Sequence, residues 1–128
     1  MKAILHVDDD PLVLDIVQAI FRHSQGIKVT SAQSAEDALQ LIPKLQPDLF
    51  IVDIAMPDIG GFELLLKLRE MSEAKNTPII ILSGRVGSFI THNPFRDMAS
   101  VILQKPVDPD RLRCEVDDIL ANGHFDED

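Results

Sequence analysis

The sequence predicts an α/β fold in which helices cover both faces of a parallel β-sheet. Five short apolar runs of strand length alternate with stretches whose apolar residues recur at helical spacing. Two of these runs, residues 49–52 and 79–82, are continuously apolar, which is typical of strands buried on both faces. The length of 128 residues suits one domain with one core.

The first predicted strand, residues 3–7, contains His6, which we expect to be a core histidine with satisfied hydrogen bonds. A helix follows, because Asp10 suits the N-cap and Pro11 suits the first helical position, where no N–H is needed. Residues 27–30 form a short second strand, which we expect at an edge of the sheet.

The remaining elements continue this alternation. The second helix is predicted to begin after Ser34 as its N-cap, and Pro43 is expected to weaken its end. The third helix lies between the two continuously apolar strands. Residues 101–103 form the fifth strand, and Asp108 with Pro109 repeats the cap-and-proline pattern at the start of a last helix.

Two segments do not fit the alternation. Between the fourth and fifth strands, Asn93 and Pro94 interrupt the pattern, so we expect a short or broken fourth helix there. Residues 122–128 are polar and acidic. We therefore expect a domain over residues 1–121 and a flexible acidic tail over residues 122–128.

Composition and charge exclude several classes of function. The chain has 12 Lys and Arg against 21 Asp and Glu, a formal net charge of −9, so we expect no direct nucleic-acid partner. Its one cysteine, Cys114, cannot form an internal disulfide and is expected to be buried or half-buried in the last helix. The sequence lacks a signal-peptide pattern and any run suited to membrane insertion, which favours a cytoplasmic location.

Polar residues follow the predicted strands at one end. Asp8 and Asp9 follow the first strand, Asp53 the third, Ser83 the fourth and Lys105 the fifth. Both common doubly wound strand orders place a site at the carboxyl ends of the strands, and the order 2-1-3-4-5 would bring the three aspartates into one crevice. Carboxylates this close need a cation or a basic side chain, which Mg²⁺ or Lys105 can supply.

These groups suit phosphoryl transfer, in which positioning and charge stabilisation do most of the catalysis. Asp53 can act as the nucleophile and form an aspartyl phosphate. A second interpretation is a Mg²⁺-dependent phosphatase with an aspartyl intermediate. It is disfavoured because Asp10 suits a helix cap and the chain has no additional domain to enclose a substrate.

The sequence resembles the receiver domain of two-component response regulators over roughly residues 2–121. The resemblance implies a flavodoxin-like (βα)5 three-layer sandwich with parallel strand order 2-1-3-4-5. It rests on five segments that occur in the family's order, residues 4–11, 52–58, 61–64, 81–84 and 104–106.

The resemblance also implies a role for each site residue. Asp53 would be the phosphoacceptor, Ser83 would contact the phosphoryl group and Lys105 would pair with it. The bond from Lys105 to Pro106 is typically cis in the family. The Mg²⁺ ligands would be Asp8, Asp9 (the more direct of the pair), Asp53 and the backbone carbonyl of Ala55.

The function implied is that of a single-domain receiver without further enzymatic activity. Asp53 would accept a phosphoryl group from a histidine kinase or a histidine phosphotransfer protein. The signal would pass to a downstream protein by contact or by relay. The open alternatives are a receiver fragment of a larger regulator and a pseudo-receiver that binds partners without phosphorylation.

Two positions depart from the family pattern, and two others bear on how fast the phosphorylated form is hydrolysed. Ile102 stands where an aromatic switch residue is common, and Pro94 interrupts the fourth helix, both on the usual output face. Ala55 and Arg85 occupy positions that tune hydrolysis in the family. Because Ala55 would position water poorly, we expect a long-lived phosphorylated form.

Overall fold

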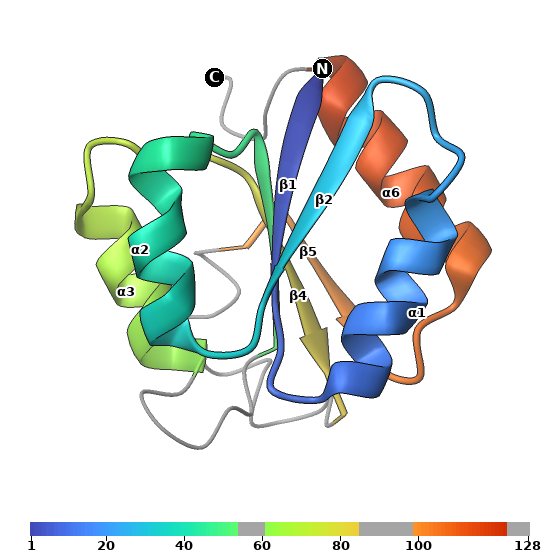
Figure 1. The fold of residues 1–128 in the computed structure, drawn as a ribbon, viewed down its shortest axis with the longest axis horizontal. Helices are drawn as coiled ribbons and strands as arrows, with labels where there is room; N and C mark the ends of the chain where they lie inside the picture. Colours follow the sequence, from blue (N-terminus) through green and yellow to red (C-terminus); the bar gives the residue numbers. More distant parts are fainter. Residues whose placement is uncertain (54–60, 85–98, 123–128) are drawn as a thin grey trace.

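The computed structural model describes residues 1–53, 61–84 and 99–122, and it confirms the predicted flavodoxin-like fold (Figure 1). Five parallel strands pair in the order β2-β1-β3-β4-β5. The elements of the described residues are β1 (Lys2–Val7), α1 (Pro11–Phe21), β2 (Ile27–Ala32), α2 (Ala35–Leu45), β3 (Leu49–Asp53), α3 (Gly61–Glu70), β4 (Ile79–Ser83), β5 (Val101–Gln104) and α6 (Pro109–Asn122).

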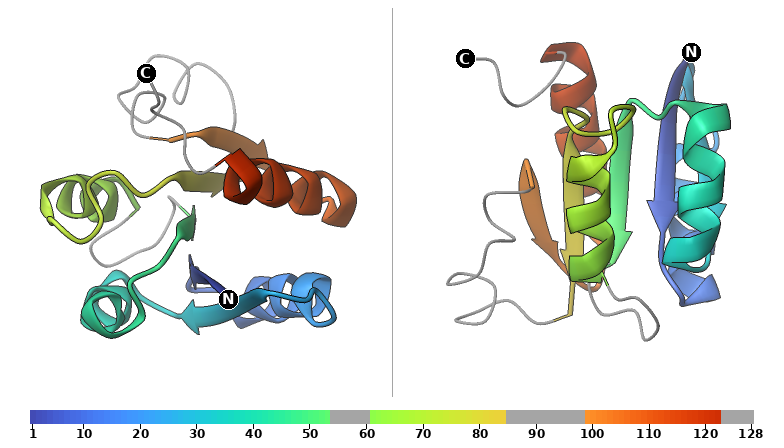
Figure 2. Two further views of the ribbon diagram at one scale, coloured as in Figure 1. Left: turned by 90° about the horizontal axis from the view of Figure 1, so that it is seen from above. Right: turned by 90° about the vertical axis from the view of Figure 1, so that its left-hand side faces the viewer.

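The sheet separates two apolar cores. Helices α2 and α3 cover one face, and α1 and α6 cover the other (Figures 1 and 2). Side chains of β1 alternate between them: Leu5 and Val7 pack on the side of α2 and α3, whereas Ile4 packs on the side of α1 and α6. Strands β3 and β4 are buried along their whole length, as their continuous apolar sequence predicts.

The predicted helix caps are present. Asp10 Oδ1 accepts a hydrogen bond from Leu12 N–H at 2.9 Å, and Ser34 Oγ accepts one from Asp37 N–H at 3.0 Å. Pro43 lies inside α2, which continues to Leu45 and ends with Gln46 in the left-handed conformation (φ 47°). A proline in the last turn removes only one intrahelical bond, so the helix does not stop there.

Two sequence predictions needed adjustment. Strand β2 lies at the sheet edge as expected, but it extends to Ala32, which pairs with Val7. Cys114 is exposed, so the prediction that it is buried or half-buried was wrong. The buried face of α6 carries Leu112 and Val116, and Cys114 lies midway between them in sequence, on the opposite side of the helix.

The expected irregular fourth helix with Pro94 falls outside the described residues, and so do residues 123–128 of the expected tail over 122–128, whereas Asn122 is the last residue of α6. Ile102 is half-buried on β5 and packs against the core beneath α2 and α3. Within the described ranges, no helix combines the length and the apolar character needed to cross a lipid bilayer.

Candidate functional site

The carboxyl edge of the sheet brings together most of the predicted site residues. Asp8 directly follows β1, Asp53 ends β3 and Ser83 ends β4, and all three are buried. Lys105 directly follows β5, and its backbone N–H donates to the carbonyl of Ser83 at 2.8 Å. The following peptide bond, to Pro106, is cis. Ala55 and Arg85 lie outside the described residues.

Asp8 is fully buried and is held by two contacts. Its Oδ1 accepts a hydrogen bond from Asp10 N–H at 3.0 Å, and its Oδ2 lies 3.2 Å from Lys105 Nζ. Burial raises the pKa of the Asp8 carboxyl to about 6, and the charge of Asp53 adds to this effect. The Asp10 N–H and Lys105 oppose the rise without cancelling it.

Lys105 bridges two of the carboxylates. Its Nζ lies 3.4 Å from Asp53 Oδ2 as well as 3.2 Å from Asp8 Oδ2, and its side chain is 22% exposed. Partial burial alone would lower the pKa of Lys105, but the charges of Asp53 and Asp8, both in contact with its ammonium, outweigh it and raise the pKa above its ordinary value of 10.5. The ammonium therefore stays charged and offsets part of the local negative charge.

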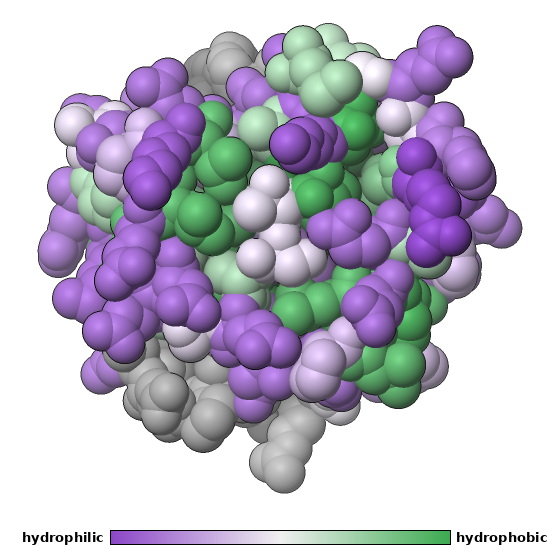
Figure 3. Space-filling view, in the orientation of Figure 1, coloured by the Kyte–Doolittle hydropathy of each residue, from purple (hydrophilic) through white to green (hydrophobic). Residues whose placement is uncertain are grey.

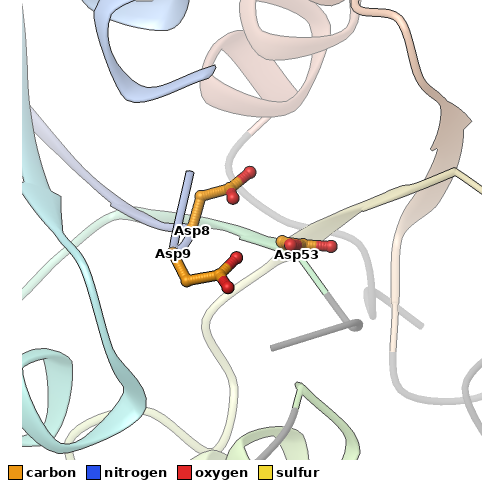
Figure 4. A group of neighbouring side chains, drawn as sticks. All are labelled: Asp8, Asp9 and Asp53. Atoms are coloured by element: carbon orange, nitrogen blue, oxygen red, sulfur yellow. The ribbon is translucent and has the colours of Figure 1, made fainter. Parts of the chain in front are cut away.

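Three carboxylates form an acidic cluster at this edge (Figure 4). Asp8 and Asp9 extend from the end of β1 toward Asp53, and one oxygen from each of the three lies within 4.8 Å of the others. Asp9 is exposed, whereas Asp8 and Asp53 are buried, so the cluster meets solvent on the side of Asp9. An all-oxygen, carboxylate-rich donor set open to water fits Mg²⁺, which prefers oxygen ligands and retains bound water.

The imidazole of His6, next to Asp8, differs from the sequence prediction in its hydrogen bonding. It is fully buried as expected, but neither ring nitrogen has a hydrogen-bond partner among the described residues, so within them it is not a satisfied core histidine. Its Nε2 lies 4.0 Å from Asp8 Oδ2. Burial, assisted by the charge of Lys105, lowers the pKa of the imidazole to about 4. The sequence feature that could have indicated this contact is the spacing: His6 lies two residues before Asp8, an expected metal ligand, and residues two apart in a strand share a face.

Fold and site together define a class: a doubly wound α/β domain with a lysine-bridged acidic cluster at the carboxyl edge of its sheet. The chain belongs to the response regulator receiver domain family of two-component systems. The model of that family, described as the response regulator receiver domain, matches residues 4–117.

Curated relatives include proteins of similar length and longer ones. The chain is 34% identical over 119 residues to response regulator Rre1 of Synechocystis, covering 93% of this chain and 52% of that protein. It is 36% identical over 106 residues to a 14.6 kDa protein of Leptolyngbya boryana, covering 83% of this chain and 80% of that one. The chain thus spans only about half the length of the first of these relatives.

Solved structures share the fold closely. The chemotaxis protein CheY4 of Vibrio cholerae aligns with a TM-score of 0.84 at 28% identity, over 92% of this chain and 98% of that one. A CheY-like receiver domain of Methanospirillum hungatei aligns with a TM-score of 0.85 at 28% identity, over 96% of both chains.

Proposed function

We propose that this chain accepts a phosphoryl group on Asp53 from a histidine kinase or a histidine phosphotransfer protein, in a Mg²⁺-dependent reaction. One observation carries the proposal. Asp53 lies at the end of β3 with Lys105 Nζ 3.4 Å away and two other carboxylates within 4.8 Å. Family membership supports the same chemistry.

The transfer needs no residue beyond those of the acidic edge. An Asp53 oxygen attacks the phosphorus and forms a P–O bond. The P–N bond of the donor phosphohistidine breaks, and its electron pair stays on the imidazole, which takes up a proton. The chain itself then carries an aspartyl phosphate, which is later hydrolysed or, in a relay, passed on to another protein.

The neighbouring groups have distinct proposed roles. Lys105 pairs with the phosphoryl group, and the hydroxyl of Ser83 donates a hydrogen bond to it. Mg²⁺, when bound, offsets the negative charge of the phosphoryl oxygens. Its proposed ligands are Asp8, Asp9, Asp53 and the backbone carbonyl of Ala55.

Helix α1 offers a surface for the donor protein. Leu12 is 65% exposed and Ile16 is 38% exposed, one turn apart, and Figure 3 shows apolar surface over the region where Figure 1 places α1. Leu12 lies in the first turn of α1, three residues after Asp9 of the cluster. A protein that packs on these side chains would bring its phosphohistidine close to Asp53.

The chain is proposed to act in the cytoplasm as a single-domain regulator, signalling by protein contact or relay. The 80% coverage of the Leptolyngbya protein supports a single-domain arrangement. The 52% coverage of the Synechocystis regulator supports the alternative, a receiver cut from a longer protein.

The test is incubation with Mg²⁺ and acetyl phosphate, read by intact mass, because the chain has no Trp or Tyr to report by fluorescence. We expect the gain of one phosphoryl group, which is lost in Asp53→Asn and in EDTA. The decay of the modified mass also measures the expected long-lived phosphoform. If acetyl phosphate does not modify the wild type and beryllofluoride, a mimic of the phosphoryl group, does not bind to it, the pseudo-receiver interpretation replaces this one.

A further inference from the structure

His6 places two polar atoms where nothing satisfies them. The imidazole is fully buried in β1, and in the part of the chain that the structure describes neither Nδ1 nor Nε2 has a hydrogen-bond partner. Its flanking partners in the sheet are Ser31 of β2 and Ile51 of β3. An apolar side chain of similar volume would avoid the desolvation of these nitrogens, so their burial calls for an explanation.

The group that faces His6 is also unsatisfied. Nε2 lies 4.0 Å from Asp8 Oδ2, a buried oxygen that has the Lys105 ion pair at 3.2 Å but no hydrogen bond of good geometry. A hydrogen bond between nitrogen and oxygen needs a separation of about 2.9 Å. If His6 and Asp8 moved about 1 Å closer, Nε2 could donate a hydrogen bond to Oδ2, and both atoms would be satisfied.

The imidazole can donate without adding charge. Full burial of the ring favours its neutral form, which carries a single N–H. With that hydrogen on Nε2, the ring presents a donor to the Asp8 carboxylate.

A divalent cation at the acidic cluster would change the contacts of Asp8. The cation repels the Lys105 ammonium, which now lies 3.2 Å from Asp8 Oδ2, and the proposed phosphoryl group would also attract Lys105. If Lys105 moved away, Oδ2 would lose its ion pair, and the buried Nε2 of His6, 4.0 Å away, would be a donor close to it. Carboxylates that ligate metals are commonly oriented by such hydrogen bonds.

We propose that His6 is a positioning residue that donates a hydrogen bond from Nε2 to Asp8 Oδ2 and holds Asp8 as a ligand for the divalent cation. This inference rests on the proposed function, because it requires the acidic cluster to bind Mg²⁺. It goes further by giving a role to a residue outside the cluster.

The experiment measures Mg²⁺ affinity by isothermal titration calorimetry and the thermal unfolding midpoint in EDTA. His6→Leu is expected to weaken Mg²⁺ binding about tenfold and to raise the unfolding midpoint, because it removes two unsatisfied buried nitrogens. His6→Gln, whose amide N–H can reach the place of Nε2, is expected to restore most of the affinity. A purely structural histidine would give the opposite pattern, a lower midpoint and unchanged Mg²⁺ affinity.

Ser100→Ala is the matched control. The Ser100 hydroxyl is also buried without a hydrogen bond, but it lies directly before β5, at the opposite edge of the sheet. Its removal should leave Mg²⁺ affinity unchanged. Equal weakening in Ser100→Ala would show that the loss in His6→Leu is a general packing effect and would overturn the inference.

A spectroscopic readout covers the case in which His6→Leu fails to fold. Long-range ¹H–¹⁵N correlation spectra of the wild type should show the Nε2–H tautomer, with an Nε2 shift that changes on addition of Mg²⁺. A Nδ1–H tautomer, or no response to Mg²⁺, would contradict the inference.

The failure of this inference can be told apart from the failure of the proposed function. If the wild type binds Mg²⁺ and His6→Leu binds it equally, only this inference fails. If the wild type binds no Mg²⁺, the proposed function fails with it.

Discussion

Polar groups are arranged differently at the two ends of the parallel strands. The strands begin at the amino edge of the sheet and finish at its carboxyl edge. At the amino edge the charged side chains of Asp48 and Arg69 are paired: Asp48 Oδ2 accepts from Ala3 N–H at 2.8 Å, and Arg69 Nη1 donates to the carbonyl of Thr77 at 2.8 Å, although the buried hydroxyl of Ser100 has no hydrogen bond among the described residues. At the carboxyl edge, buried Asp8 and Asp53 are both in contact with Lys105, and the nitrogens of His6 have no hydrogen bond.

This difference indicates that the amino edge contributes mainly to stability and the carboxyl edge mainly to binding. Charges held close together at one edge are unfavourable until a cation joins them. Mutations at the two edges should therefore affect stability and Mg²⁺ affinity in different ways.

The largest effect is expected from Asp8→Asn. Mg²⁺ affinity should fall by more than the roughly 10- to 100-fold typical of losing an outer partner of a metal site, because a direct ligand is lost. The metal-free protein should become more stable by about 1–2 kcal/mol at pH 7, because a buried charge with a raised pKa is removed. Calorimetry and thermal unfolding in EDTA measure the two changes. If Mg²⁺ affinity and the stability of the metal-free protein both fell, the assignment of binding to the carboxyl edge and stability to the amino edge would be contradicted.

The second prediction concerns pH. Asp8 has its pKa raised on folding from 3.8 to about 6, so its contribution to the stability of the metal-free protein is full below about pH 4 and is lost as the pH rises through about 6. Mg²⁺ must displace this proton, and its affinity should be about tenfold weaker at pH 5 than at pH 7.5. Titrations at several pH values test this. An affinity independent of pH would show that Asp8 is already ionised at pH 5 or is not a ligand.

A smaller effect is expected at the amino edge from Arg69→Ala. Arg69 Nη1 contacts the carbonyls of Ala74, Lys75 and Thr77, which tie the end of α3 to the start of β4. Loss of these hydrogen bonds should lower the free energy of unfolding by about 1 kcal/mol. Urea unfolding measures this change. Mg²⁺ affinity should stay the same, and a parallel loss of affinity would show that the two edges are coupled.

The smallest effect is expected for Leu12→Ala. This variant distinguishes the binding of a protein donor on helix α1 from the binding of a cation at the acidic cluster. Phosphoryl transfer from a protein donor should slow about threefold, since one exposed apolar contact is lost, while labelling by acetyl phosphate should not change. The control is Leu66→Ala, because Leu66 is 41% exposed on α3, on the other face of the sheet. If both variants slow transfer equally, helix α1 is not the docking surface.

The order of elements and the residues of the acidic edge could be predicted from sequence, because in a parallel sheet the residue after each strand must reach the same edge. That rule places Asp8, Asp53 and Lys105 together without any knowledge of distances. It does not reveal that Lys105 contacts both carboxylates, since this depends on the separations of the strand ends in three dimensions.

The errors have a common physical origin. The exposure of Cys114 depends on which side of α6 faces the sheet, and the stripe of Leu112 and Val116 was the signal that could have indicated it. The unsatisfied state of His6 depends on which groups lie across the strand, and periodicity carries no information about these.

The run Asp8-Asp9-Asp10 brings three identical side chains into three environments: a buried one, an exposed one and a helix cap. Each residue should therefore accumulate different substitutions over evolutionary time. At Asp10, Ser, Thr or Asn could replace the cap, whereas at Asp8 only Asn would keep the Oδ1 that accepts the N–H of Asp10. Asp9 could drift to other polar residues as soon as cation binding was no longer under selection. Among descendants of this chain, a change at position 9 alone would be an early mark of a receiver that has lost its cation.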